Sequence, residues 1–260
     1  MYIKHMYKTR IIVNADDCGY SETVSSHISA AIEKHRVTST TIMANKDDFE
    51  GAIRMYNEYH DSVSFGFHLN LTEGHPLTSS QQLLDIGFFK EENGTTVFNA
   101  QPFRRKLLSK SVREAIYNEA LAQATSIMDS GVNLSHIDGH HFIHQAVFML
   151  PLLPRLCKEI GVHKVRNYRN YMPKSINKWA RGQWVQLIKF SYTNIRTTDW
   201  FTGFEDFYKL EASAQRYYQD GETIELMCHP GGKYFEEEDL LMNTDVEMLF
   251  QCELINYYQI

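Results

Sequence analysis

The sequence predicts a single α/β domain in which parallel strands alternate with helices to form a (β/α) barrel. A length of 260 residues suits one such barrel. Short β-branched or apolar runs alternate with longer amphipathic runs, which is the pattern of successive βα units on a parallel sheet. No repeat, low-complexity tract or linker rich in proline, glycine and serine interrupts the series, so one domain is expected over residues 1–260.

Seven strands are expected. Each consists mainly of β-branched or apolar residues, and each is followed by a helix. In chain order the strands are expected at 11–15 (IIVNA), 38–44 (TSTTIMA), 63–71 (VSFGFHLNL), 134–138 (LSHID), 164–167 (KVRN), 195–198 (IRTT) and 223–228 (TIELMC). The helices are expected at 22–35, 47–60, 112–129, 146–160, 175–190, 208–219 and 236–257. The fifth and sixth strands carry the weakest pattern.

One long connection interrupts the regular alternation. Residues 72–111 separate the third strand from its helix, and connections of that length are usually lids or binding loops. We therefore expect an insertion at about 72–111 that contributes to a binding site.

Composition excludes several classes of partner. The chain has 26 Lys and Arg against 32 Asp and Glu, and this net charge of -6 gives no electrostatic case for a nucleic acid ligand. The start, MYIKHMYKTR, has no apolar signal region, and no stretch approaches the ~20 apolar residues that span a bilayer. We expect a cytoplasmic protein without a membrane partner. The four cysteines form no C-x-x-C pair, which argues against a disulfide framework or a thiolate zinc site.

Polar residues gather at the expected ends of the strands. Parallel strands align these ends on one face of the sheet, which is where α/β enzymes carry their chemistry. In chain order these residues are Asp16, Asp17, His68, His136, Asp138, His140, Arg166, Asp199, Trp200 and His229. Their grouping predicts an active site at this face.

Two adjacent carboxylates, Asp16 and Asp17, follow the first strand. Side chains alternate along a regular strand, so the two share a pocket only where the strand twists into its loop. Two carboxylates at such a short distance repel each other, and each needs its own cation or hydrogen-bond donor. The alternative is that one caps the helix beginning near Glu22 while the other is solvated.

The stretch SHIDGHHFIH places His136, Asp138 and His140 at alternating positions, so an extended backbone directs all three to one side. A single histidine is more often a core or surface residue than a ligand. This stretch, however, contains four histidines around Asp138, and that concentration favours a cluster of metal ligands. Asp138 suits the role of fixing the tautomer of a ligating imidazole. His68, in an apolar strand, is costly to bury unless it is coordinated or makes an internal hydrogen bond.

One carboxylate and two imidazoles make a three-ligand site with open positions, which suits zinc or another divalent ion that activates a water molecule. The second aspartate would then act as a base beside that water. His229 stands in the turn MCHPGG after the last strand, although turn composition alone would also explain that stretch.

Five motifs, NADDCG, VTSTT, HLNLTEG, HIDGHHFIH and MCHP, occur in this order between about residues 11 and 230. In sequence and spacing they resemble the YdjC-like carbohydrate deacetylases, whose members include ChbG-type chitooligosaccharide deacetylases. The resemblance implies a distorted (β/α) barrel of the glycoside hydrolase/deacetylase type. It also implies hydrolysis of the N-acetyl group of an amino sugar or short oligosaccharide with a divalent metal ion, Mg²⁺ or Zn²⁺.

The resemblance also implies roles for individual residues. The metal ligands would be Asp17, His68 and His140, the base Asp16 and the acid His229; Arg166 would orient the base. Asp138 and His136 are expected to support the ligands, and the sugar-facing wall would include Trp200, Asp199 and Phe142. The chain departs from the family at Cys18 and Phe142, where phenylalanine and a third consecutive histidine are usual.

Two other functions remain open. A non-haem iron oxygenase would use His136, Asp138 and a distant histidine as its two-histidine, one-carboxylate site. Such sites usually lie on antiparallel double-sheet folds, and this alternative leaves Asp16 and Asp17 unexplained. A catalytically inactive sugar-binding barrel needs neither a base nor an acid, so the presence of both Asp16 and His229 argues against it. The expected partner is a small-molecule or oligosaccharide substrate, and apolar surface on the insertion would support a homodimer.

Overall fold

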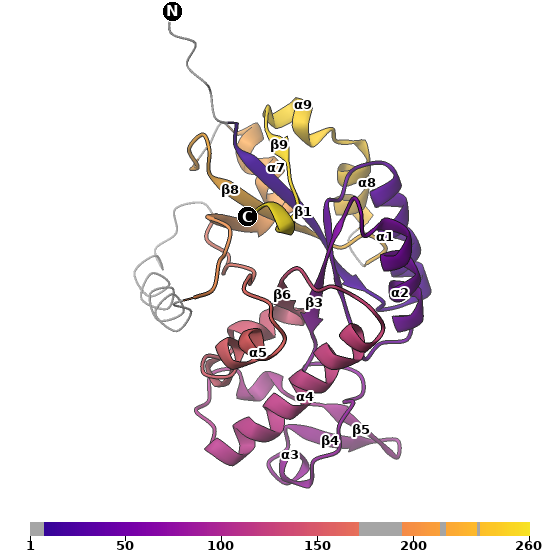
Figure 1. The fold of residues 1–260 in the computed structure, drawn as a ribbon, viewed down its shortest axis with the longest axis vertical. Helices are drawn as coiled ribbons and strands as arrows, with labels where there is room; N and C mark the ends of the chain where they lie inside the picture. Colours follow the sequence, from indigo (N-terminus) through magenta and orange to yellow (C-terminus); the bar gives the residue numbers. More distant parts are fainter. Residues whose placement is uncertain (1–7, 172–193, 214–216, 233–234) are drawn as a thin grey trace, which may run out of the picture.

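The protein is described here by a computed structural model that covers residues 8–171, 194–213, 217–232 and 235–260 (Figure 1). In this part of the chain one sheet contains seven strands, in the order β6-β3-β2-β1-β8-β7 with β9 also beside β1. All of its strand pairs are parallel, which confirms the α/β class. The strands are β1 Arg10–Cys18, β2 Ser39–Ile42, β3 Ser64–Leu69, β6 Ile137–Gly139, β7 Trp200–Gly203, β8 Thr223–Cys228 and β9 Glu253–Leu254.

Between β6 and β7 the barrel wall is irregular. The strands expected at 164–167 and 195–198 are isolated parallel bridges, Ile137 to Val165 and Lys164 to Arg196, and the regular strand lies at 200–203 instead. A side-chain hydrogen bond replaces part of the backbone hydrogen bonding between these segments: Asn167 Nδ2 donates to the carbonyl of Thr198 at 2.7 Å. The result is the distorted barrel that was expected, with a different set of seven strands.

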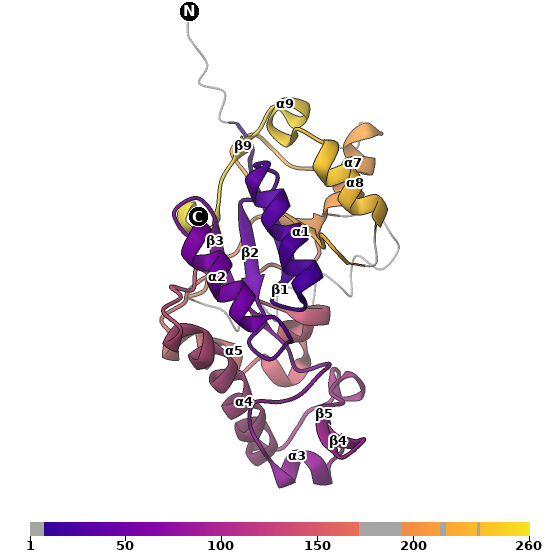
Figure 2. The ribbon, with the colours of Figure 1, turned by 90° about the vertical axis from the view of Figure 1, so that its right-hand side faces the viewer.

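Helices cover the outside of the sheet. Helices α1 (Glu22–Glu33) and α2 (Phe49–Tyr59) lie side by side against β1 and β2 (Figures 1 and 2). Helix α1 begins where the Ser21 hydroxyl accepts from Val24 N, a normal N-cap. The remaining helices near the sheet are α4 (Lys110–Asp129), α5 (Leu153–Glu159), α7 (Phe204–Ala212), α8 (Phe235–Asn243) and α9 (Val246–Phe250).

Two of the long helices predicted from the sequence are broken, and one lies outside the described residues. In place of a helix at 146–160, a short turn η3 (Val147–Met149) precedes α5, because Pro151 would fall inside the longer helix, where proline is poorly tolerated; Pro154 lies in the first turn of α5, where it is accepted. In place of 236–257, α9 begins anew at the Asp245 cap, and β9 and η4 (Tyr257–Gln259) follow. The helix expected at 175–190 falls in a segment that the structure does not describe.

The insertion is folded. It contains α3 (Gln81–Asp85), an antiparallel hairpin of β4 (Phe89–Glu92) and β5 (Thr95–Phe98), and the turn η1 (Gln101–Phe103). Asn93 and Gly94 both have positive φ at the hairpin turn, the conformation that an Asn-Gly pair favours. Figure 1 places these elements beside α4 at one end of the molecule.

Within the described residues, no helix has the length and apolar character that crossing a membrane requires.

Candidate active site

The two aspartates lie at the carboxyl end of β1, where the strand is bulged. Ala15 pairs with Thr40 and Cys18 with Ile42, so two residues of β1, Asp16 and Asp17, oppose one residue of β2 and the pairing shifts there. Asp17 has a left-handed backbone with φ of 68°. A bulge re-aims a side chain, and it explains how two adjacent carboxylates enter one site.

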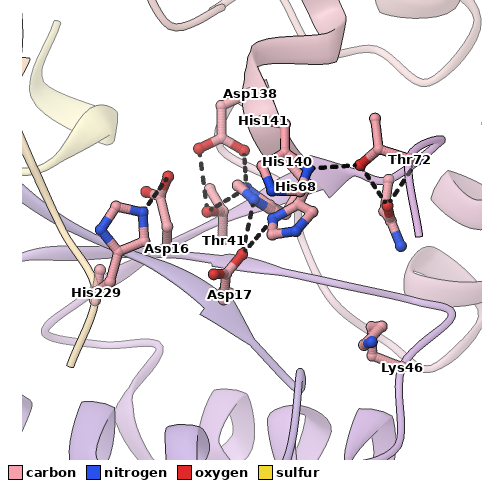
Figure 3. A network of polar contacts seen from close by, with 12 residues as sticks. Asp16, Asp17, Thr41, Lys46, His68, Thr72, Asp138, His140, His141 and His229 are labelled. Atoms are coloured by element: carbon pink, nitrogen blue, oxygen red, sulfur yellow. Dashed lines mark hydrogen bonds and ion pairs between the residues drawn. The ribbon is translucent and has the colours of Figure 1, made fainter. Parts of the chain in front are cut away.

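Asp17 lies between two imidazoles (Figure 3). Its Oδ1 atom is 3.1 Å from His68 Nε2 and 2.8 Å from His140 Nδ1. One ligand atom from each of these three residues lies within 4.8 Å of the other two. The residues come from β1, from β3 and from the start of the turn η2 (His140–Gln145), which follows β6 beside β3. The structure thus brings together the three residues that were expected as metal ligands.

Asp138 holds the other side of the His68 ring. Its Oδ1 is 2.6 Å from His68 Nδ1, and its Oδ2 accepts from the Thr41 hydroxyl at 3.1 Å. This contact fixes the ring so that Nε2 faces Asp17. Burial disfavours the charged imidazolium, but the carboxylates of Asp138 and Asp17 outweigh it and raise the pKa of His68 to about 10.

The insertion supplies a carboxylate that sequence analysis did not single out. Glu73 Oε1 lies 3.6 Å from His140 Nε2 and 3.2 Å from Lys46 Nζ. The ion-pair contact with His140, with help from Lys46, lowers the pKa of Glu73 to about 2. Glu73 therefore faces the His140 ring, at a longer distance than Asp138 from the His68 ring. Its signal was the acidic residue in the motif HLNLTEG.

Asp16 is held by Arg166 in a bidentate ion pair. Arg166 Nη1 and Nη2 donate to the two carboxylate oxygens at 2.7 and 2.6 Å, and Asn14 Nδ2 donates to Oδ1 at 2.9 Å. Burial disfavours the carboxylate, but the guanidinium outweighs it and lowers the pKa of Asp16 to about 2. Asp16 is therefore ionised at neutral pH and fixed in orientation.

Arg166 also contacts two further buried carboxylates. Its Nη2 lies 2.9 Å from Asp138 Oδ2, and its Nε donates to Glu225 Oε1 at 2.7 Å. Glu225 also accepts from the hydroxyl of Tyr257, in the last turn of the chain. Burial raises the pKa of Glu225 to about 7, against the opposing attraction of Arg166. In the sequence, the only indication of this role is that Glu225 is an acidic residue inside the otherwise apolar strand TIELMC.

His229 follows β8 and faces the same site (Figure 3). Its Nε2 lies 4.0 Å from Asp16 Oδ2, and its Nδ1 lies 3.3 Å from Glu237 Oε2 on α8. Glu237 also accepts from the backbone N–H of His229 at 3.0 Å, so it holds both the ring and the main chain. Burial disfavours the imidazolium, but Glu237 and Asp16 outweigh it and raise the pKa of His229.

Two further histidines of the cluster are enclosed at deeper positions. His136 stacks on Tyr257 at 3.5 Å between ring centroids, and its Nδ1 lies 2.8 Å from the Ser135 hydroxyl. Burial lowers the pKa of His136 well below its ordinary value and that of His144 to about 3, so both rings are neutral. His136 contacts neither His68 nor His140 through a hydrogen bond that the structure records for the described residues. Of the two residues expected to support the ligands, only Asp138 contacts one of them.

The predicted positions of Asp199 and Trp200 are wrong. The strand runs from Trp200 to Gly203, so these residues stand at its start, and Trp200 pairs with Ile224 near the amino end of β8. Asp199 Oδ2 accepts from the Thr223 hydroxyl at 2.8 Å, and Trp200 Nε1 donates to Glu222 Oε2 at 2.7 Å. Both side chains therefore stabilise the end of the barrel away from His229.

Phe142 lies close to the site in an uncommon backbone conformation. Its ring centroid is 6.0 Å from that of Phe201, and the Arg166 guanidinium lies 5.0 Å from the Phe201 ring. Both Phe142 and its neighbour His141 have positive φ. The placement is compatible with the expected role of Phe142 in the wall of a substrate pocket.

The residues present fit a divalent metal ion. The carboxylates of Asp16, Asp17 and Asp138 concentrate negative charge around His68 and Arg166. The buried His140 Nε2 has no hydrogen-bond partner. Two imidazole nitrogens and one carboxylate oxygen form a donor set that suits zinc and related divalent ions.

The chain resembles known proteins in three comparisons: with a family model, with individual sequences and with a solved structure. A model of the family described as YdjC-like protein matches residues 10–255. Proteins named carbohydrate deacetylase from Brevibacillus brevis and Geobacillus stearothermophilus are each 30% identical; the alignments cover 95% of this chain and 94% or 96% of theirs. The crystal structure of an Enterococcus faecalis protein, described as a candidate cellobiose-phosphate cleavage protein, has a TM-score of 0.75 at 25% identity and covers 97% of this chain and 98% of its own.

Proposed function

The chain belongs to the YdjC-like family, and on that premise we propose that it is a metal-dependent carbohydrate deacetylase. Its reaction is the hydrolysis of the N-acetyl group of an amino sugar or of a short, chitooligosaccharide-like substrate. The observation that carries the proposal is the convergence of Asp17, His68 and His140 beside a separately held carboxylate, Asp16, and a separately held imidazole, His229. The names of the relatives from Brevibacillus brevis and Geobacillus stearothermophilus support the same reaction.

Asp17, His68 and His140 would hold the metal ion. When bound, a divalent ion polarises the acetyl carbonyl and makes nearby water more acidic. Imidazole ligands suit Zn²⁺ better than Mg²⁺, which prefers oxygen, so Zn²⁺ is the first ion to test. Asp138 fixes the His68 ring on one side of this set, and Glu73 lies beside the His140 ring on the other.

Asp16 is the proposed general base. It is ionised at neutral pH because Arg166 binds both of its oxygens, and the same ion pair fixes its orientation toward the site. A carboxylate with a low pKa is a weak base, so it removes a proton effectively only from an acidified water. This matches a site that also carries a divalent ion.

His229 is the proposed general acid. The amine of the sugar leaves readily only after protonation, and an imidazolium supplies that proton. Glu237 and Asp16 raise the pKa of His229, which favours the protonated ring at neutral pH. Glu237 also binds the Nδ1 side, so the Nε2 side is the one that faces Asp16 and the site.

The two alternatives differ in their support. The oxygenase requires His136, but this residue belongs to none of the three groups with metal-ligand geometry in the described part of the chain. The parallel sheet is also unlike the double-sheet folds that usually carry that site. An inactive sugar-binding barrel is distinguished from an enzyme by experiment.

The decisive experiment is a mass-spectrometric screen of N-acetylated monosaccharides and oligosaccharides with Zn²⁺-loaded protein. We expect loss of one acetyl group from at least one substrate, abolished by a chelator and restored by Zn²⁺. Asp16→Asn serves as the matched control because the amide preserves shape and removes the base. Binding of a sugar without turnover in any sample would refute the proposal and favour the sugar-binding barrel.

A further inference from the structure

The turn that follows β6 contains two consecutive residues in the left-handed region. His141 has φ and ψ of 51° and 28°, and Phe142 has 57° and 31°. Residues other than glycine, asparagine and aspartate rarely adopt this conformation. Where it occurs, it usually involves one residue and not two in succession. Such strain persists only where surrounding contacts enforce it, and it gathers at functional sites.

The bend has two consequences for the proposed site. It comes directly after His140, whose Nδ1 reaches Asp17 at 2.8 Å. It also places Phe142 beside Phe201, the ring that lies next to the Arg166 guanidinium. The same local conformation therefore positions an expected metal ligand and an aromatic wall residue.

Arg104, from the insertion, binds the carbonyl groups of both strained residues. Its Nη1 donates to the carbonyl of His141 at 2.6 Å, and its Nη2 donates to that of Phe142 at 3.2 Å. The carbonyl of Arg104 accepts from Val147 N at 2.8 Å, so the turn is held from both ends. Thr72, at the start of the insertion, adds a contact of 3.0 Å between its hydroxyl and His141 Nδ1 (Figure 3).

We propose that Arg104 is a positioning residue that holds the left-handed bend at His141 and Phe142, and thereby fixes His140 and Phe142 in the site. Two charge-assisted hydrogen bonds are comparable in strength to the strain of two left-handed residues, so Arg104 decides whether the bend persists. The insertion is then a structural part of the site. The consequence for metal affinity rests on the proposed function, whereas the clamp on the bend does not.

The first test is hydrogen exchange of the Val147 amide, together with calorimetric titration of Zn²⁺. In Arg104→Ala we expect exchange about tenfold faster and Zn²⁺ binding about tenfold weaker, because the bend relaxes and His140 loses its position. Arg105→Ala is the matched control, since this neighbouring arginine is exposed, and it is expected to resemble the wild type. Equal behaviour of the two alanine variants would overturn the proposal.

The second test separates the clamp from a general structural role. Glycine adopts the left-handed region without strain, so His141→Gly removes part of what Arg104 has to oppose. Within that background, adding Arg104→Ala should change Val147 exchange by less than about threefold. His141→Gly also removes the contact with Thr72, which is why the effect of Arg104→Ala is compared inside each background. The same fold-change in both backgrounds would refute the clamp.

Two further outcomes also decide the question. If Arg104→Ala does not fold, Arg104→Lys replaces it, because one ammonium group cannot donate to both carbonyls with the geometry of a guanidinium. Exchange of Val147 about threefold faster is then expected, and unchanged exchange counts against the proposal. If the wild type binds no Zn²⁺, the proposed function fails, while the exchange data still decide the role of Arg104.

Discussion

Glu225 provides a stability prediction that requires no knowledge of the substrate. The residue is fully buried on β8, where it binds Arg166 Nε and the Tyr257 hydroxyl. Burial raises its pKa from an ordinary 4.5 to about 7. Replacement by glutamine, of nearly the same shape, removes the titration.

The sign of the effect follows from proton binding. Between pH 4.5 and pH 7 the folded protein keeps the Glu225 proton, whereas the unfolded chain has lost it. The free energy of unfolding therefore falls as pH rises through this window, and the cost is complete above pH 7. At about 1.4 kcal/mol per pH unit, the difference between the two pKa values corresponds to about 3 kcal/mol.

The assay is urea unfolding of the wild type and Glu225→Gln at pH 5 and pH 8, in the presence of a chelator so that metal binding does not contribute. We expect the wild type to lose about 2.5 kcal/mol more than the variant between these pH values, because a small part of the full effect is already lost at pH 5. At pH 5 Glu225 is neutral in the folded wild type, as glutamine is in the variant, and the attraction between Arg166 and the ionised carboxylate at pH 8 is already contained in the pKa of Glu225. Glu253→Gln, an exposed glutamate, should follow the wild type. Parallel curves for the wild type and Glu225→Gln would refute this reasoning.

Three predictions concern the site itself. Metal content of purified variants should fall in His68→Ala and remain in His144→Ala, and the reverse order would exclude the proposed ligand set. Asp16→Asn should keep the metal and lose about a hundredfold to ten-thousandfold in turnover, as expected for removal of a general base, whereas loss of metal would make Asp16 a ligand. His229→Ala should lose far more activity on an N-acetyl amino sugar than on an activated aryl acetate, provided that the wild type hydrolyses both; equal losses with the metal retained would make His229 an orienting residue.

The sequence predicted best those parts of the fold that depend on local apolar pattern. β8 begins and ends at Thr223 and Cys228 as expected, because six consecutive residues are buried on both faces. The carboxyl ends of β1, β3 and β6 converge because parallel strands align, so Asp17, His68 and His140 can be grouped from the strand pattern alone. The expectation that the two aspartates share a site only at an irregular strand end agrees with the bulge at Asp17.

Other parts depend on long-range contacts that no local pattern reports. A displacement of the expected sixth strand by about five residues moved Trp200 from the carboxyl end of a strand to its start, and its side chain to the opposite end of the barrel. Glu73 gains its place only because the insertion folds back on His140, and Glu225 because Arg166 crosses the barrel interior to reach it. Tyr257 returns from the end of the chain to the barrel interior.

Arg166 connects the two halves of the proposed mechanism. Its donors contact Asp16, which is the proposed base, and Asp138, which orients the proposed ligand His68. The third carboxylate, Glu225, binds the Nε side and fixes the plane of the guanidinium. A lysine has one ammonium group and cannot reproduce this planar fork, so the position requires arginine for its geometry as well as for its charge. Orientation of the base and orientation of the metal ligand are thus set by one buried side chain, and a displacement of Arg166 would disturb both.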